Sequence, residues 1–153
     1  MSRPPQGYWA TNLYLDPRKR PKIEAPLRDL PPRAAQRFKK AREGLRDLKH
    51  VTEQVVFLGT VYKWVWMYEV GGRKLAYLHP MESGASGTFV LTEAEEQELV
   101  QADGLLRPIR DAMRDGDVRD GLRWCWTEFP DLDVVEAFVD LIARKHHFLA
   151  RPE

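Results

Sequence analysis

Residues 61–79 read VYKWVWMYEVGGRKLAYLH, and this stretch decides the fold of the chain. Its first half is rich in Val, Trp and Tyr, the residue types that fit the pleated surface of a β-strand. Gly71 and Gly72 follow. A pair of glycines is typical of the type I′ turn, which needs positive φ at both central positions. A second strand-like run comes after the turn, so we expect an antiparallel β-hairpin over residues 61–79.

Counting outward from the turn gives the expected register of the hairpin, with Glu69 opposite Lys74 and Trp66 opposite Tyr77. Side chains alternate between the two faces of a sheet. One face is then aliphatic, the expected core beneath helices, and is made of Val61, Val65, Met67, Ala76 and Leu78. The other is almost wholly aromatic and is made of Tyr62, Trp64, Trp66, Tyr68, Leu75, Tyr77 and His79.

The elements around the hairpin follow from apolar periodicity and from capping signals. Thr92 and Glu95 have the spacing of a capping box, and Asp133 with Glu136 repeats it before the last helix. We expect loops over residues 80–87 and 114–121. The other expected elements are a helix over 32–48, a strand over 88–91, helices over 93–102 and 106–113, a strand over 122–128 and a helix from 133. The fold class is therefore α+β, a single domain with an antiparallel sheet of about four strands and helices packed on one face.

The overall composition is that of a globular protein. The chain has 153 residues, of which 43% are hydrophobic and 31% charged. No apolar run approaches the ~20 residues of a membrane span, and the N-terminus lacks the apolar region of a secretory signal. A single cysteine, Cys125, permits no internal disulfide. These features favour a cytoplasmic protein with no membrane partner.

Charge is unevenly distributed along the chain. Residues 1–49 hold 13 Lys and Arg against 5 Asp and Glu, whereas residues 50–153 hold 11 against 18. A basic N-terminal part can contact nucleic acid through phosphates, or it can dock on its own acidic domain. Net charge is only +1, and nucleic-acid modules usually carry a domain-wide basic excess. A solvated basic helix and tail is the preferred interpretation, with nucleic-acid binding as the alternative.

Residues 1–31 contain six prolines and read as an irregular N-terminal segment, distinct from an α+β domain over residues 32–153. Proline removes a backbone donor and restricts its neighbour. Five apolar residues in this segment suggest that it folds over the domain or contacts a partner, for example in a homodimer. These residues are Tyr8, Trp9, Leu13, Tyr14 and Leu15.

The order of the elements and their motifs resembles a bacterial family known as domain of unknown function 3788, and is similar in layout to YdhG-like small domains. The resemblance covers about residues 36–148. It rests on a helix, Trp64 with Tyr68, the GRK of 72–74, the LAYLHP of 75–80, the GLRW of 121–124 and the last helix. It implies a compact α+β domain with an antiparallel sheet and helices on one side, and it implies no reaction. Family members often have a hydrophobic strand where this chain has the Gly/Ser-rich residues 82–87.

The aromatic face is the place where we expect function. Trp124 and Trp126 repeat the spacing of Trp64 and Trp66 and offer a second wall. Aromatic walls with a few polar groups are typical of small-molecule pockets, although packing within the core also explains them. The predicted function is non-catalytic binding of a small molecule, with no cofactor. The predicted ligand-binding residues are Tyr62, Trp64, Trp66, Tyr68, Tyr77, His79, Trp124 and Trp126.

Catalysis and metal binding have less support in the sequence. His79 could act as a general base only if a carboxylate such as Glu82 or Glu128 oriented it. The acidic stretch 114–121 lacks the ligand spacing of a calcium loop, and no nucleotide, hydrolase or zinc motif is present. We therefore predict no catalytic residue and no metal ligand.

Overall fold

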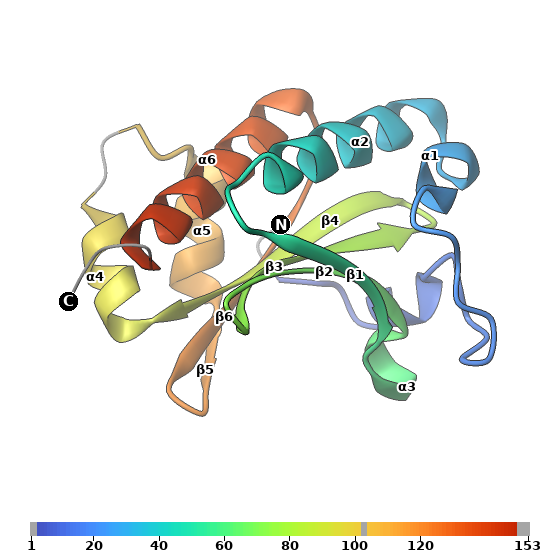
Figure 1. The fold of residues 1–153 in the computed structure, drawn as a ribbon, viewed down its shortest axis with the longest axis horizontal. Coiled ribbons are helices and arrows are strands. Elements are labelled where there is room, and N and C mark those ends of the chain that lie inside the picture. Colours follow the sequence, from blue (N-terminus) through green and yellow to red (C-terminus); the bar gives the residue numbers. More distant parts are fainter. Residues whose placement is uncertain (1–2, 102–103, 150–153) are drawn as a thin grey trace.

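The computed structural model describes residues 3–101 and 104–149, which form a single α+β domain (Figure 1). A six-stranded antiparallel sheet has the strand order β1-β2-β3-β4-β6-β5. The predicted fold class and the antiparallel sheet are confirmed, whereas the predicted number of about four strands is wrong. The strands are β1 (Thr52–Phe57), β2 (Trp64–Val70), β3 (Arg73–Met81), β4 (Gly84–Thr92), β5 (Asp117–Arg119) and β6 (Leu122–Glu128).

Two predicted loops are strands in the structure. Residues 80–87 complete β3 and begin β4, which leaves only Glu82 and Ser83 as a tight turn. The small residues of this stretch look like a loop in the sequence, but packing requires them. A Cβ added to Gly87 would lie 2.7 Å from the ring of Phe138 and 2.8 Å from that of Phe129. The predicted loop 114–121 contains β5, which pairs with β6 through a turn at Asp120-Gly121.

A β-bulge in the central hairpin changes which residues share a face. The turn at Gly71-Gly72 forms as predicted, with both residues at positive φ and Glu69 opposite Lys74. The register then shifts between Tyr68 and Glu69, so that Tyr68 lies opposite Ala76 and not opposite Leu75. A one-residue shift moves every later side chain of one strand to the other face.

The predicted all-aromatic face is therefore wrong. Trp64, Trp66 and Tyr68 pack with Ala76 and Leu78 in the main core, on the face that the helices cover. Tyr77 packs with Val65 and Met67 on the opposite face. Tyr62, which we expected in the strand, lies in the short helix α3 (Gly59–Tyr62).

Helices cover one face of the sheet (Figure 1). Four of them have the predicted positions with small shifts at their ends: α2 (Pro32–Arg46), α4 (Glu93–Val100), α5 (Arg107–Asp115) and α6 (Leu132–Leu149). The predicted capping box of α4 is confirmed, since the Thr92 hydroxyl accepts a hydrogen bond from the Glu95 amide (3.1 Å). Asp131, and not the predicted Asp133, caps the last helix by accepting from the Val134 amide (2.9 Å). The predicted end of α4 at residue 102 lies outside the described residues. A further short helix, α1 (Ala25–Asp29), lies within the N-terminal segment that was expected to be irregular.

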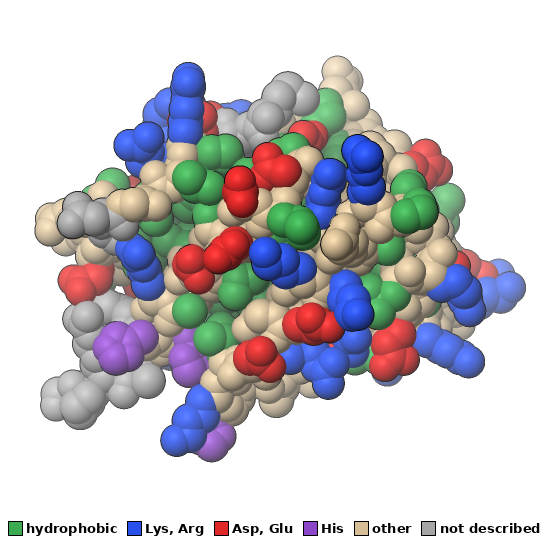
Figure 2. All heavy atoms as spheres, turned by 90° about the horizontal axis from the view of Figure 1, so that it is seen from above, with side chains coloured by type: hydrophobic (Ala, Val, Ile, Leu, Met, Phe, Trp, Pro, Cys, Tyr) green, Lys and Arg blue, Asp and Glu red, His purple; other side chains and the backbone are tan. Residues whose placement is uncertain are grey.

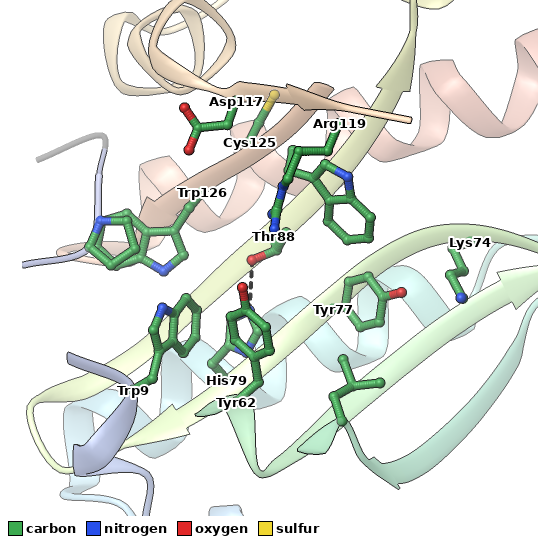
Figure 3. Close-up of a pocket in the computed structure, with 13 residues that line it drawn as sticks. Trp9, Tyr62, Lys74, Tyr77, His79, Thr88, Asp117, Arg119, Cys125 and Trp126 are labelled. Atoms are coloured by element: carbon green, nitrogen blue, oxygen red, sulfur yellow. Dashed lines mark hydrogen bonds between the residues drawn. The ribbon is translucent and has the colours of Figure 1, made fainter. Parts of the chain in front are cut away.

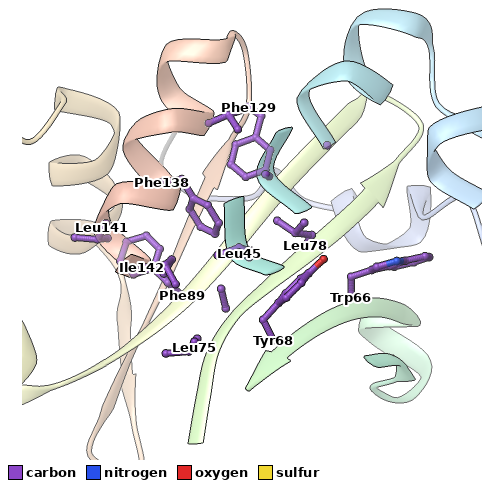
Figure 4. Close-up of a cluster of buried hydrophobic side chains, with 14 of the residues drawn as sticks. Leu45, Trp66, Tyr68, Leu75, Leu78, Phe89, Phe129, Phe138, Leu141 and Ile142 are labelled. Carbon is purple, nitrogen blue, oxygen red and sulfur yellow. The ribbon is translucent and has the colours of Figure 1, made fainter. Parts of the chain in front are cut away.

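The main core lies between the sheet and helices α2 and α6 (Figure 4). The predicted apolar stripe of α2 is buried there through Phe38, Ala41 and Leu45. Burial of a large apolar side chain stabilises the fold by about 1.5–3 kcal/mol. The rings of Phe38, Trp66 and Tyr68 are completely buried in this layer.

The first part of the N-terminal segment, which includes the 3₁₀ helix η1 (Tyr8–Thr11), lies on the opposite face of the sheet from α2 and α6 (Figure 1). The later part packs against the main core through Tyr14, Ile23 and Leu27. Beyond Leu78, β3 is no longer paired with β2, and residues 11–13 pair with it instead. The amide of Leu13 donates to the Pro80 carbonyl (3.0 Å), and that of Glu82 donates to the Thr11 carbonyl (2.8 Å). Pro80 is tolerated within β3 because the pairing of β3 with β2 ends at Leu78.

Within the described residues, no helix combines the length and apolar character needed to cross a membrane.

Candidate functional site

A cavity of about 390 Å³ lies on the face of the sheet that α2 and α6 leave uncovered (Figure 3). Its volume is within the range of small-molecule pockets. Segments far apart in the sequence contribute to it, from the N-terminal segment through β3 and β4 to β6. Its aromatic lining is Trp9, Tyr62, Tyr77, Trp124 and Trp126, and its polar lining is Lys74, His79, Thr88, Asp117 and Arg119. Pro4, Leu58 and Cys125 complete it.

One end of the cavity is built by the N-terminal segment. The ring of Trp9 makes edge contacts with the rings of Tyr62 (5.0 Å between centroids) and His79 (4.7 Å). Asn12 holds the segment in place, because its Nδ2 donates to the carbonyls of Trp64 (2.9 Å) and Tyr62 (3.2 Å). Asn12 is only 1% exposed, so these hydrogen bonds are shielded from competing water. The segment is therefore a fixed wall of the cavity.

Ser86 joins two more aromatic residues to this end of the cavity. Its hydroxyl oxygen accepts hydrogen bonds from the Tyr8 hydroxyl (2.7 Å) and from Nε1 of Trp126 (3.1 Å). The two rings also meet edge to face at 5.1 Å. Edge-to-face pairs add about 0.5–1.5 kcal/mol beyond burial, so this cluster stabilises the contact between the segment and the sheet.

The opposite end is built by Tyr77 and Trp124, whose rings stack with centroids 6.2 Å apart and planes inclined by 23°. The guanidinium of Arg119 lies 5.4 Å from the centre of the Trp124 ring, a cation–π contact. Figure 3 shows Arg119 reaching over the cavity from β5, while Lys74 lies beyond Tyr77. This end of the cavity thus combines flat apolar surface with positive charge.

His79 lies at the base of the cavity and forms a hydrogen bond through Nε2 with the hydroxyl of Thr88 (2.7 Å) (Figure 3). Burial lowers the pKa of His79 to about 3, so its ring is neutral at physiological pH. Its other nitrogen, Nδ1, is buried and has no hydrogen-bond partner among the described residues. A neutral imidazole offers one donor and one acceptor, so one of these remains unused.

The eight predicted site residues divide between the two faces of the sheet. Five of them line this cavity: Tyr62, Tyr77, His79, Trp124 and Trp126. The structure buries the other three in the main core, where other parts of the chain satisfy their polar atoms. Trp64 Nε1 donates to the Asp16 carbonyl (2.8 Å), Trp66 Nε1 to the Ile23 carbonyl (2.8 Å) and the Tyr68 hydroxyl to Glu53 (2.6 Å).

Other lining residues were not predicted from the sequence, among them Trp9, Lys74, Thr88, Asp117 and Arg119. The signal for Trp9 was present in the apolar residues of the N-terminal segment, which were expected to fold over the domain or to contact a partner. Thr88 was placed in the expected strand 88–91, but its face could not be assigned without the partner strands. Arg119 was placed in a loop, and only β5 brings it over the cavity.

The geometry gives little support to proton transfer by His79. Neither Glu82 nor Glu128 lines the cavity, and burial is the only cause of the lowered pKa of His79. The acid in the lining, Asp117, forms an ion pair with Arg3 (3.5 Å). Burial also raises the pKa of the Cys125 thiol to about 12, which keeps it protonated and weakly nucleophilic. The arrangement is suited to binding.

The helix-covered face of the molecule carries charges of both signs (Figure 2). Lys39 pairs with Glu43 on α2 (3.9 Å), and Lys40 pairs with Glu136 on α6 (3.4 Å). Nucleic-acid binding relies on an excess of positive charge that follows the phosphate backbone. This face therefore lacks the uniform basic surface that nucleic-acid binding favours. No group of three metal-ligating side chains gathers within the part of the chain that the structure describes.

Comparisons with protein-family models, with curated proteins and with solved structures find no match to this chain. The resemblance to the family known as domain of unknown function 3788 and to YdhG-like domains stays a prediction from the sequence.

Proposed function

We propose that the cavity on the uncovered face of the sheet binds a small planar organic molecule. The observation that carries the proposal is the combination of aromatic walls with a buried, neutral histidine that keeps one unused nitrogen. Trp9 and Tyr62 form one wall, and Tyr77 and Trp124 form the other. Flat rings offer stacking surface to a flat ligand with little loss of conformational freedom.

The polar groups of the lining can orient a ligand within this largely apolar cavity. The hydrogen bond between His79 and Thr88 fixes the imidazole ring. Nδ1 of His79 is buried and has no partner among the described residues, which costs about 1–3 kcal/mol. A ligand atom gains this contact only where the side chains around the ring move aside. Sites of this kind bind ligands through apolar contact and select them through a few polar groups.

The fixed walls favour binding to a preformed site. Asn12 and Ser86 hold the N-terminal segment through buried hydrogen bonds, so the Trp9 wall is ordered before a ligand arrives. Preorganisation of this kind reduces the entropy lost on binding. We place the protein in the cytoplasm as part of the same proposal, and we propose no reaction.

A thermal-shift screen of two-ring aromatic fragments, in acidic, neutral and basic forms, tests this proposal. A fragment that binds the folded state raises Tm by mass action, and calorimetry then gives its Kd. Trp124→Leu removes one wall and should weaken each confirmed fragment by about tenfold, the loss of one stacking contact of roughly 1–2 kcal/mol. Tyr14→Leu is the matched control, because Tyr14 is also a half-buried aromatic residue but lies against Trp66, away from the cavity.

Two results would contradict the proposal. One is a screen in which no fragment raises Tm. The other is a set of fragments whose affinity Trp124→Leu leaves unchanged, or which Tyr14→Leu weakens equally.

A further inference from the structure

The rim of the cavity carries two basic side chains that have no acidic partner. Lys74, at the start of β3, and Arg119, at the end of β5, are both exposed and both line the cavity. Among residues 3–101 and 104–149, neither forms an ion pair. These two cations border the largely aromatic cavity, so a ligand bound there would meet their charge.

The acidic groups near the rim do not cancel this charge. Asp117 lines the cavity, but its carboxylate already pairs with Arg3. Glu69 is the register partner of Lys74 on β2, although it makes no ion pair with it. Of the charged side chains that line the cavity, two are cations, Lys74 and Arg119, and one is an acid, Asp117, so the net charge of the lining is positive. His79, at the base of the cavity, is neutral near pH 7 because burial lowers its pKa.

Arg119 is held where it can contact a ligand. Asp120 and Gly121 both have positive φ (53° and 77°), which gives the tight turn that aligns β5 with β6. The guanidinium lies over the Trp124 ring. A stacked guanidinium keeps its N–H groups free at the edge, in the planar fork that suits a carboxylate. Lys74 lies at the Tyr77 end of the same cavity (Figure 3).

We infer that the ligand of this cavity is a planar aromatic carboxylate. This inference rests on the proposed function of the cavity and adds the chemical class of the ligand. The ring system lies between the aromatic walls, and the carboxylate faces the rim, where Arg119 and Lys74 provide charged hydrogen-bond donors. The guanidinium of Arg119 gives the directional contact, and the ammonium of Lys74 adds attraction without a fixed geometry.

Calorimetric titration with 2-naphthoate and 2-naphthamide tests the inference, because the two molecules have the same ring system and nearly the same shape but differ in charge. Exposed ion pairs contribute modestly, so two of them together should make the naphthoate bind about tenfold more tightly than the amide. This preference should shrink as salt rises toward about 0.5 M, since exposed charges are screened. The double variant Lys74→Gln/Arg119→Gln should reduce the preference to less than about threefold.

Arg73→Gln is the matched control, since Arg73 neighbours Lys74 but does not line the cavity; the acid preference should survive in it. Equal binding of acid and amide, or tighter binding of the amide, would overturn the inference and leave the proposed function standing. A preference that the double variant retains would also overturn it. If neither compound binds and the fragment screen gives no ligand, the proposed function fails and the inference fails with it.

Discussion

Replacing Trp66 and Trp124 separately by Ala should have very different effects on stability, because the β-bulge places them on opposite faces of the sheet. Trp66 is completely buried. A fully buried Trp→Ala change costs about 3–5 kcal/mol. Loss of the hydrogen bond from Nε1 to the Ile23 carbonyl adds about 1 kcal/mol. The expected total is about 4–6 kcal/mol, a large part of the ~5–15 kcal/mol that stabilises a typical domain.

Trp124 should tolerate the same change. It is half-buried, and its contacts are a stacked ring and an exposed guanidinium. These contacts contribute roughly 1–2 kcal/mol together. Urea unfolding followed by far-ultraviolet circular dichroism measures both values. With a slope of about 2 kcal/mol per M, Trp66→Ala should lower the midpoint by about 2–3 M, and Trp124→Ala by less than about 1 M.

Equal losses of stability in the two variants would refute the assignment of faces. If Trp124→Ala cost more than Trp66→Ala, the register with the bulge at Tyr68/Glu69 would be wrong. The cavity would then lose its structural basis, because Tyr77 and His79 would return to the helix-covered face.

Three further changes test other parts of the structure. The lowered pKa of His79 means that the unfolded chain, with an ordinary His pKa near ~6.5, binds a proton that the folded state excludes. The contribution of His79 to the free energy of unfolding should therefore be fully present above about pH 6.5 and fall as pH drops toward 3. Between pH 7.5 and 5 the free energy of unfolding of wild type should fall by about 2 kcal/mol more than that of His79→Gln. An equal fall in both proteins would contradict the buried neutral ring. Gly87→Ala should destabilise the fold by about 1–3 kcal/mol, because the added methyl group meets the rings of Phe138 and Phe129, and an unchanged urea midpoint would exclude this close approach. Thr92→Ala should cost about 1 kcal/mol through loss of the capping box, whereas Thr92→Ser should retain most of the stability; equal stability of the two variants would argue against the cap.

The local signals in the sequence predicted the elements that depend on local physics. The turn at Gly71-Gly72, the capping box at Thr92 and the buried stripe of α2 through Phe38 all appear in the structure. Each is determined by residues within about one turn of chain, so one sequence is enough to recognise it.

The face assignment failed because it depends on an extra residue that has no local signal. Leu75 is skipped in the ladder between β2 and β3, and both Leu75 and Ala76 then pack in the main core. A bulge of this kind is stabilised by what the flanking side chains contact on each side of the sheet. Counting residues from the turn cannot reveal it.

The start of β4 failed for a related reason. Residues 84–87 are small and were expected in a loop, but the strand passes directly beneath the rings of Phe129 and Phe138. The side chain of Ser86 lies on the opposite face of the sheet, where its hydroxyl accepts hydrogen bonds from Tyr8 and Trp126. These demands come from residues 40 or more positions away, so the sequence alone cannot display them.

The candidate site was predicted in part. The sequence pointed to Tyr77, His79 and Trp124, and the structure brings them to one cavity. It did not reveal that Trp9 closes one end or that Arg119 reaches over the other. Both contributions depend on pairing between distant segments: residues 11–13 with β3, and β5 with β6.

The most direct test of the ligand-binding cavity uses the five indole N–H signals of the protein in a ¹H–¹⁵N spectrum, assigned through single Trp→Phe variants. Trp9, Trp124 and Trp126 line the cavity, whereas Trp64 and Trp66 lie in the main core and act as internal references. Titration with 2-naphthoate should shift the first three signals in a saturable manner and leave the other two in place. Shifts confined to Trp64 and Trp66, or no shift in any of the five, would contradict binding in this cavity.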